Sequence, residues 1–198
     1  MLKYLIVSKV RVKILELLLT NPNEVFHVRE ITRRIDEEIN AVRRELAHLE
    51  DSGFLTSERR ANRLVYFFRP DNILYQDLLS MVYKTSGLGG KIVKNKSKLG
   101  KIKFATLSLS FAKGKAYNPD KIDLLVIGDV ALTDLAKIVR DEEVRIDREI
   151  NFTPMTEDEF AFRKNRTDPF IEEVLRSPRI MLIGDEEDLL RAKAPVVS

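Results

Sequence analysis

The chain has 198 residues, enough for one large domain or two small ones, and 44% of them are hydrophobic, which is sufficient to bury a core. The absence of cysteine excludes a disulfide scaffold and a thiolate metal site, and two histidines are too few for a histidine-rich metal site. No apolar run approaches the ~20 residues of a membrane helix, and the first residues do not form a signal peptide, so we expect a soluble cytoplasmic protein.

Charge is distributed unevenly, although the net charge is only +3. Residues 1–70 carry +3 (13 basic against 10 acidic residues), residues 71–121 carry +7 (10 against 3) and residues 122–198 carry −7 (11 against 18). The basic middle would add phosphate contacts to a DNA complex, whereas the acidic C-terminal part would oppose them. A high charged fraction with a single glutamine and no cysteine is also typical of a thermophile.

Residues 8–20 are predicted to form the first helix. Ser8 suits the N-cap position, and residues 21–23, which include Pro22, end the helix. The apolar residues expected on its buried face are Val10, Ile14, Leu17 and Leu18.

A short strand over residues 25–27 is expected to pair with a later hairpin, and a second helix covers residues 28–35. Asp36 and Glu37 then form a turn. We interpret His27, in the short strand, as a structural residue rather than a metal ligand, because metal ligands occur in clusters.

Residues 39–49 are predicted to form a third helix, because their apolar residues recur at helical spacing. The residues on this buried face are Ile39, Val42, Leu46 and Leu49. The residues on the opposite face are Asn40, Arg43, Arg44 and Ala47. Gly53 follows the helix and suits a left-handed cap.

Residues 54–58 and 64–68 are predicted strands joined by a basic turn over residues 59–63. The arginines of this turn are Arg59, Arg60 and Arg63. Two helices followed by such a hairpin are typical of a winged helix-turn-helix, in which the second helix enters the major groove and the hairpin contacts the flanking backbone. We therefore interpret this stretch as a DNA-binding domain.

The predicted DNA-binding residues are Asn40, Arg43, Arg44, Arg59, Arg60 and Arg63. Asn40 suits adenine and Arg44 suits guanine in the major groove, whereas the hairpin arginines suit phosphates or a minor-groove edge. The alternative is that these side chains are ordinary solvated charge on amphipathic elements. Position favours DNA binding, because the basic side chains cluster on the two surfaces that reach DNA in this motif.

Residues 73–84 are predicted to form a strongly apolar helix, which either packs on the winged helix or pairs with its copy in a homodimer. The residues on its expected apolar face are Leu74, Leu78, Met81 and Val82. The glycine-rich residues 86–90 are predicted to form a hinge. The domain boundary placed there gives a DNA-binding domain over residues 1–86 and a second domain over residues 87–198.

The second half predicts an α/β domain with a small mixed sheet, and the whole chain is therefore an α+β protein. The predicted strands are residues 102–109, 122–127, 149–155 and 180–183. The predicted helices are a basic helix that begins at Lys91, residues 132–140, a helix capped by Thr156, residues 169–175 and residues 186–193.

Residues 109–114 (Leu-Ser-Phe-Ala-Lys-Gly) and residues 121–128 (Lys-Ile-Asp-Leu-Leu-Val-Ile-Gly) resemble the minimal nucleotidyltransferase motif. In that family a Gly-Ser pair begins the first element and an Asp-x-Asp pair lies at the second strand. Further similar segments are residues 148–151, 159–160, 168–170, 174–175 and 183–185. Over residues 8–190 the chain resembles prokaryotic and archaeal regulators that fuse an ArsR-like (arsenic-repressor-like) winged helix to a nucleotidyltransferase-like domain.

The departures from this family concern its catalytic residues. Such enzymes bind two Mg²⁺ ions through carboxylates, which on a strand must lie two residues apart to share a face. Here those positions hold Lys121 and Asp123, and a lysine would repel a metal ion. Leu109 replaces the glycine that allows close approach of a triphosphate, and Glu149 is the only candidate for a third acidic ligand. We therefore predict no catalytic residues and no metal or other cofactor.

A degenerate site can still bind an anion, such as a nucleotide phosphate, without metal, and Lys113, Lys115 and Lys121 near Ser110 could hold it. The candidate nucleotide- or anion-binding residues are Ser110, Lys113, Gly114, Lys121 and Asp123. The alternative is that the lysines are solvated surface and that Asp123 is hydrogen-bonded to the loop at Ser110.

The sequence thus predicts a transcriptional regulator that reads double-stranded operator DNA as a homodimer. Its inactive nucleotidyltransferase-like domain would serve ligand sensing, with a nucleotide as the candidate effector, or oligomerisation. One alternative is a Mg²⁺-dependent nucleotidyltransferase or antitoxin-type enzyme that modifies a protein or a small molecule. Another is a structural interaction module whose arginines are ordinary surface residues.

Overall fold

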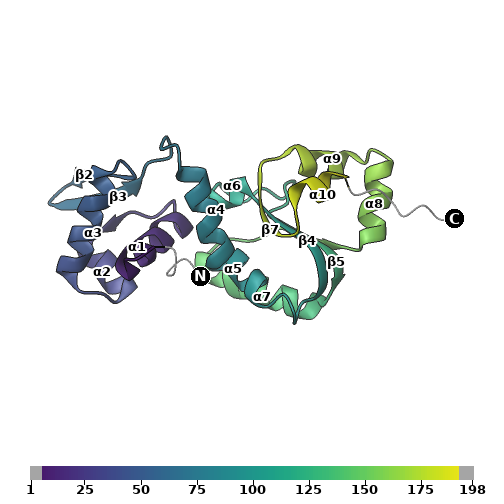
Figure 1. Ribbon diagram of the computed structural model, residues 1–198, viewed down its shortest axis with the longest axis horizontal. Coiled ribbons are helices and arrows are strands. Elements are labelled where there is room, and N and C mark those ends of the chain that lie inside the picture. The colour runs from purple at the N-terminus through teal and green to yellow at the C-terminus, as the bar shows by residue number, and fades with distance from the viewer. Residues whose placement is uncertain (1–5, 192–198) are drawn as a thin grey trace. The chain divides into compact units, whose positions relative to one another are not determined.

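The computed structural model describes residues 6–191 (Figure 1). Cα packing divides the chain into an N-terminal unit, Met1–Ser86, and a C-terminal unit, Gly87–Ser198, which are described separately. No helix within residues 6–191 combines the length and the apolar character that crossing a membrane requires.

The N-terminal unit contains four helices and a three-stranded sheet within its described residues. Its elements are α1 (Lys9–Thr20), β1 (Phe26–His27), α2 (Val28–Ile35), α3 (Ile39–Asp51), β2 (Leu55–Arg60), β3 (Arg63–Phe68) and α4 (Tyr75–Thr85). The sheet is antiparallel with strand order β1-β3-β2. Helix α2, helix α3 and the β2–β3 hairpin (the wing) follow one another as in a winged helix-turn-helix, which agrees with the prediction (Figure 1).

Helix α1 begins after Ser8, whose hydroxyl accepts a hydrogen bond from the backbone N–H of Arg11, as predicted for an N-cap. Its buried residues are Val12, Ile14, Leu15, Leu18 and Leu19. The predicted buried face was therefore wrong at Val10 and Leu17, which are only partly buried. The cause is that α1 contacts α2, α3 and α4, so neighbouring elements cover more of it than one narrow stripe.

The buried face of α4 also differs from the prediction. It consists of Tyr75, Leu79, Val82 and Tyr83. Leu74 precedes the helix and is 46% exposed, and Leu78 and Met81 are only partly buried. The ring of Tyr75 packs against Phe68 with 5.5 Å between centroids, so a tyrosine carries much of the apolar contact that the prediction gave to aliphatic residues. Because α4 also contacts α1, this face packs within its own unit.

The C-terminal unit contains a four-stranded sheet and six helices within its described residues. Its elements are α5 (Gly87–Lys94), β4 (Gly100–Ser108), α6 (Leu109–Ala112), β5 (Leu124–Val130), α7 (Leu132–Ile146), β6 (Phe152–Met155), α8 (Glu157–Asn165), α9 (Pro169–Arg176), β7 (Arg179–Ile183) and α10 (Glu186–Arg191). The strand order is β6-β5-β4-β7, and only the β5–β6 pair is parallel. The sheet is thus small and mixed, as predicted, and Thr156 caps α8.

The glycine-rich segment at residues 86–90 was predicted to be a hinge, and this was wrong for most of it. Helix α5 begins at Gly87, and Leu88 and Ile92 on it are fully buried. Packing of these two side chains outweighs the low helix propensity of the glycines. The last residues of the predicted helix over 186–193 lie outside the described residues.

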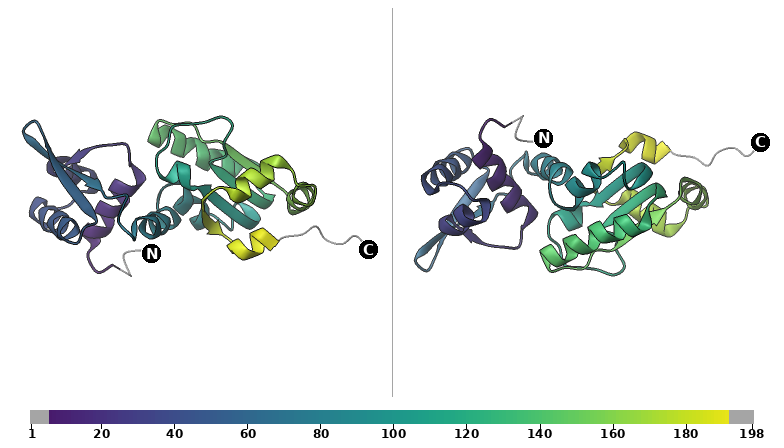
Figure 2. Two further views of the ribbon diagram at one scale, coloured as in Figure 1. Left: turned by 90° about the horizontal axis from the view of Figure 1, so that it is seen from above. Right: turned by 90° about the horizontal axis from the view of Figure 1, so that it is seen from below.

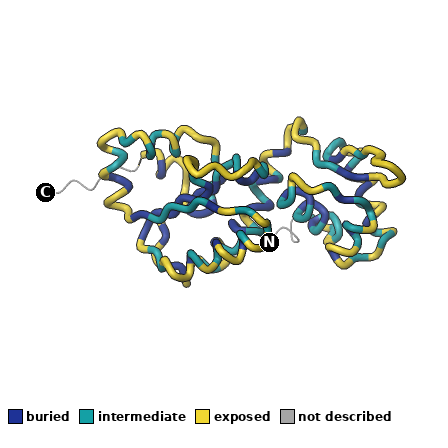
Figure 3. Tube along the Cα trace, turned by 180° about the vertical axis from the view of Figure 1, so that it is seen from behind, coloured by how far each residue is buried: buried dark blue, intermediate teal, exposed yellow. Residues whose placement is uncertain are grey.

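One cluster of the core of the C-terminal unit lies against one face of the sheet, and the other face is covered as well, since Leu124 and Val126 of β5 are fully buried. The residues of this cluster are Phe104, Leu125, Ile127, Met155, Phe160, Ile171 and Leu189. Leu125 and Ile127 share one face of β5 because side chains alternate along a strand. Figure 2 shows α7 and α10 on opposite sides of this sheet, and Figure 3 shows the buried residues gathered along its strands.

Candidate nucleic-acid interface and candidate ligand pocket

Helix α3 presents one polar face to solvent, as the sequence predicts. Glu38 caps the helix, since its carboxylate accepts hydrogen bonds from the backbone N–H groups of Asn40 and Ala41 at 2.8 Å each. These two hydrogen bonds hold the pKa of Glu38 below its usual value. The buried residues of α3 are Val42, Leu46 and Leu49, whereas Ile39, which was also predicted on this face, is only partly buried. The exposed residues of its outer face are Asn40, Arg43, Arg44 and Ala47.

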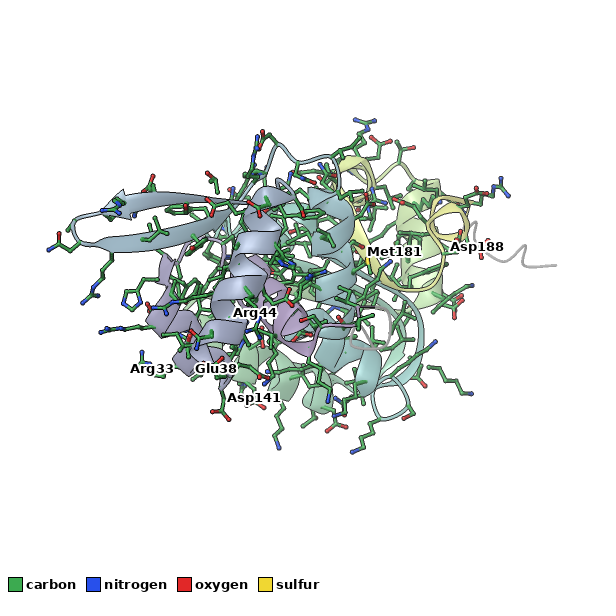
Figure 4. All side chains as sticks on the ribbon, turned by 60° about the vertical axis from the view of Figure 1, so that its left-hand side comes forward. Arg33, Glu38, Arg44, Asp141, Met181 and Asp188 are labelled. Atoms are coloured by element: carbon green, nitrogen blue, oxygen red, sulfur yellow. The ribbon has the colours of Figure 1, made fainter. Side chains whose placement is uncertain are left out.

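The two arginines of α3 are exposed. Among the described residues, no carboxylate forms an ion pair with Arg43 or Arg44. Two further exposed arginines, Arg29 and Arg33, lie on α2, form no ion pair within residues 6–191 and were missed by the prediction. The signal was present in the sequence, because both arginines alternate with the buried Ile31 and Ile35 on an amphipathic helix. Figure 4 labels Arg44 together with Glu38 and Arg33 in this part of the molecule.

The tip of the wing is tighter than predicted. The expected five-residue turn over residues 59–63 is a two-residue turn, because Arg60 and Arg63 are cross-strand partners at the ends of β2 and β3. Ala61 in the turn has a positive φ of 53°. The guanidinium of Arg60 lies 5.0 Å from the centroid of the Phe67 ring and forms an ion pair with Glu58. These side-chain contacts of Arg60 stabilise the pairing of β2 with β3 next to the turn.

The three wing arginines lie on different faces of the hairpin. Alternation along β2 places Arg59 on the same face as Ser57, whose hydroxyl donates to the Glu50 carboxylate of α3 at 2.6 Å. Arg59 therefore projects from the face that is turned toward α3, and among the described residues it forms no ion pair. Arg60 and Arg63 project from the opposite face. The sequence could not distinguish these positions, because it placed all three in one turn.

His27 links β1, α2 and the wing. Its Nδ1 accepts a hydrogen bond from the backbone N–H of Glu30 at 3.0 Å, so the imidazole caps α2. Its Nε2 lies 3.1 Å from Nη1 of Arg63. The predicted structural role of His27 is therefore observed, and Arg63 lies beside it.

A pocket of about 290 Å³ lies in the C-terminal unit, bordered by the end of β4, α6, the segment before β5 and α9. Three of the predicted nucleotide- or anion-binding residues line it, namely Ser110, Lys121 and Asp123. Lys113 and Gly114, also predicted, do not line it. Lys115, which the sequence also suggests as an anion contact, lines it too, and the basic lining residues that the prediction missed are Arg148 and Arg179.

Asp123 is buried and fully engaged by its own chain. Its Oδ1 accepts a hydrogen bond from Nη2 of Arg148, and its Oδ2 accepts one from the backbone N–H of Asn151, both at 3.1 Å. The Arg148 guanidinium also lies 4.8 Å from the centroid of the Phe111 ring. Burial raises the pKa of Asp123, and the charge of Arg148 acts in the opposite direction. The alternative, in which the Asp123 side chain is hydrogen-bonded to the loop at Ser110, is not observed, because its carboxylate oxygens make these contacts instead.

These residues do not fit the pair of Mg²⁺ ions that the resemblance implies. Within residues 6–191, no three carboxylate or histidine side chains are grouped as metal ligands. Both oxygens of Asp123 already have partners, and Arg148 occupies one side of the carboxylate as a fixed cation. The exposed Lys121 adds a second positive charge at the same pocket.

The helix pair, wing and basic outer face define the N-terminal unit as a winged helix-turn-helix. No family model matches the chain, and no curated protein matches it. Among solved structures, reduced HlyU from Vibrio cholerae N16961 is similar to part of it, with 20% identity over 42% of this chain and 80% of that chain and a TM-score of 0.34.

Proposed function

We propose that this protein is a DNA-binding transcriptional regulator that reads operator DNA with α3 and the wing, as a homodimer. The main support is that Arg43, Arg44 and Arg59 are exposed on adjoining surfaces and have no ion-pair partner among the described residues. A cation that is neither buried nor paired is available to a phosphate or to a base edge.

In this proposal α3 lies in the major groove. Asn40 contacts adenine and Arg44 contacts guanine, because their side chains match the donor and acceptor pattern of these bases. Arg43 and Arg59 contact phosphates beside the groove. Arg63 approaches the flanking backbone from the other face of the wing, where Arg60 is held by Glu58 and the Phe67 ring and contributes less. The unpaired Arg29 and Arg33 of α2 add to the attraction between this unit and DNA.

Homodimerisation is part of the proposal, because two half-sites related by a two-fold axis require two copies of the reader. Leu79 and Val82 of α4 are buried within their own unit and are therefore not available to a partner. Ile73, which is 91% exposed, and Leu74 lie just before α4 and offer apolar surface to a second copy.

We propose that the C-terminal unit is a nucleotidyltransferase-like domain that senses a ligand or supports oligomerisation and does not transfer nucleotides. The support is the ion pair of Asp123 with Arg148, which takes up the carboxylate that would otherwise bind a metal ion. Lys115 and Lys121 are exposed at the pocket and would attract an anionic group, such as the phosphate of a nucleotide effector, without a metal ion.

The test of DNA binding is a titration of the full chain with fluorescent DNA fragments from around its own gene at several salt concentrations. We expect one fragment to bind tightly, with an affinity that falls steeply as salt rises, because bound counterions are released from the phosphates. Arg44→Ala should weaken this binding by about 1–3 kcal/mol. Arg140→Ala, at an exposed position of α7, is the matched control and should leave it unchanged. Weak and equal binding to every fragment, with and without added nucleotides, would contradict the proposal.

The enzymatic alternative is tested by incubating the protein with labelled ATP and Mg²⁺. We expect no transfer of label, because Asp123 is engaged by Arg148 and Asn151. Transfer that disappears in Asp123→Asn would show instead that the C-terminal unit is an active nucleotidyltransferase.

A further inference from the structure

Two hydrogen-bond donors approach the imidazole of His27. The backbone N–H of Glu30 donates to Nδ1 at 3.0 Å and thereby caps α2. On the other side of the ring, Nη1 of Arg63 lies 3.1 Å from Nε2. Arg63 reaches His27 because it lies two residues before Val65, the cross-strand partner of His27, and so projects from the same face of the sheet.

A neutral imidazole accepts a hydrogen bond at one nitrogen only, and a guanidinium has donors but no acceptor. Because Nδ1 accepts the cap hydrogen bond, Nε2 carries the proton. The Nε2–H of His27 and the Nη1–H of Arg63 are then two donors that face each other at 3.1 Å. Such an arrangement is favourable only when an acceptor oxygen lies where both donors can reach it.

Acids on the neighbouring positions do not supply this acceptor. Glu58, on the same face of the wing, pairs with Arg60. Glu30, in the first turn of α2, has its carboxylate 3.4 Å from Arg34. Arg63 is exposed and forms no ion pair with any described residue. The position is therefore open to an external anion.

We propose that His27 Nε2–H and the Arg63 guanidinium together bind one non-bridging oxygen of a DNA backbone phosphate. This inference rests on the proposed DNA-binding function and adds His27 to the interface. A phosphate oxygen supplies the acceptor that both donors lack, and its charge is balanced by the guanidinium. The contact joins the start of the helix-turn-helix to the wing and fixes the position of the wing on the DNA.

Two variants separate this role from a structural one. His27→Asn keeps a cap acceptor for the Glu30 N–H, because asparagine is a good N-cap residue. Its amide NH2 is a donor but lies closer to the backbone, so it does not reach the position of Nε2 beside Arg63. Arg63→Gln changes an exposed residue at the wing tip and leaves the fold intact. Thermal unfolding of both variants, compared with the wild type, verifies that each is folded.

The experiment measures binding of the full-length protein to a fluorescent duplex that the wild type has selected from a random-sequence library. Each phosphate of the duplex is replaced in turn by an uncharged methylphosphonate. We expect each variant to bind on the order of tenfold more weakly, with effects that are not additive in the double variant. One methylphosphonate position should weaken wild-type binding but leave the variants nearly unchanged. Arg63→Gln should also lower the salt dependence by about one phosphate contact, whereas His27→Asn should not.

Three results would overturn the assignment. If folded His27→Asn binds every duplex as the wild type does, His27 only caps α2. If inorganic phosphate shifts the His27 ring resonances while no single DNA phosphate shows coupling to the variants, the site binds free phosphate instead. If the wild type selects no duplex at all, the proposed DNA-binding function itself fails, and the phosphate contact fails with it.

Discussion

Arg148 and Asp123 form an ion pair at the wall of the C-terminal pocket, with 3.1 Å between Nη2 and Oδ1. Only 17% of the Arg148 side chain and 6% of the Asp123 side chain are exposed. The chain thus places its own cation against the carboxylate that the nucleotidyltransferase resemblance assigns to a metal ion. This arrangement favours a pocket that binds ligands without metal over one that performs phosphoryl chemistry.

Replacing Arg148 by methionine is expected to reduce the free energy of unfolding by about 3 kcal/mol, because it leaves Asp123 buried without its charge partner. Methionine keeps an apolar, flexible side chain against the Phe111 ring. The double variant Asp123→Asn/Arg148→Met should recover part of this loss. Urea unfolding of the full chain, followed by circular dichroism, provides the four values of the cycle. Losses that simply add in the double variant would contradict the coupling.

The predictable parts of the molecule are those in which an element packs by one face. The helical spacing of Val42, Leu46 and Leu49 predicts α3 and its exposed arginines, because this helix buries one stripe only. The same reasoning is wrong for α4, where Tyr75 and Tyr83 supply half of the buried face. A prediction based on the spacing of aliphatic residues overlooks tyrosine rings, which are apolar apart from one hydroxyl group.

The candidate sites were predictable in part, for a related reason. Ser110, Lys121 and Asp123 line one pocket, as the motif suggests. Arg148 could not be assigned as the partner of Asp123, because the two residues are 25 positions apart and meet only after folding. The separation of Arg59 from Arg60 likewise depends on strand register, which fixes the face from which each side chain projects.

Glu142 is expected to hold α5 against α7. Its side chain is 1% exposed and forms ion pairs with Lys91 of α5 at 2.9 Å and with Arg145 at 2.7 Å. Glu142→Gln should therefore lower the free energy of unfolding by about 2 kcal/mol at neutral pH. The control is Asp141→Asn, which also replaces a carboxylate of α7 by an amide, but at an exposed position. Glu143 is less suitable, because its carboxylate accepts a hydrogen bond from the Ile150 N–H. Urea unfolding compares the variants, and equal effects at Glu142 and Asp141 would refute the role.

The contribution of Glu142 is also expected to depend on pH. Burial raises the pKa of Glu142, but hydrogen bonds and charges from Arg145 and Lys91 outweigh it, so the pKa lies below its ordinary value of 4.5. A folded-state pKa below the unfolded one means that the stabilisation is present above pH 4.5 and is lost as pH falls through the folded pKa. The difference in unfolding free energy between wild type and Glu142→Gln should shrink over that range. A constant difference would show that the charge of Glu142 is not the cause.

Two glycines with positive φ are expected to respond differently to alanine. At Gly128 (φ +143°) an added Cβ would lie 2.2 Å from the carbonyl oxygen of Lys101, so β4 and β5 must separate locally. At Gly53 (φ +73°) an added Cβ would meet no atom within 4 Å outside the adjacent residues, so only the conformational penalty of about 1–2 kcal/mol applies. Scanning calorimetry should therefore show a larger loss for Gly128→Ala than for Gly53→Ala. The reverse order would contradict the close packing of β4 on β5.

Arg59 and Arg60 are adjacent in sequence, yet we expect them to contribute unequally to DNA binding. Arg59 forms no ion pair with any described residue and projects from the face of the wing turned toward α3. Arg60 projects from the other face, where Glu58 neutralises its charge and the Phe67 ring covers it. A phosphate contact by Arg60 would first have to break these interactions, whereas Arg59 is available without rearrangement.

Arg59→Ala should therefore weaken binding to the selected duplex and reduce the salt dependence by about one phosphate contact, while Arg60→Ala should change either quantity little. Glu58→Gln provides the reciprocal variant, because it releases Arg60 and should strengthen binding modestly at low salt. Fluorescence anisotropy at several salt concentrations measures all three. If Arg60→Ala weakens binding as much as Arg59→Ala, the contacts with Glu58 and Phe67 do not keep Arg60 from DNA, and the inferred difference between the two arginines is wrong.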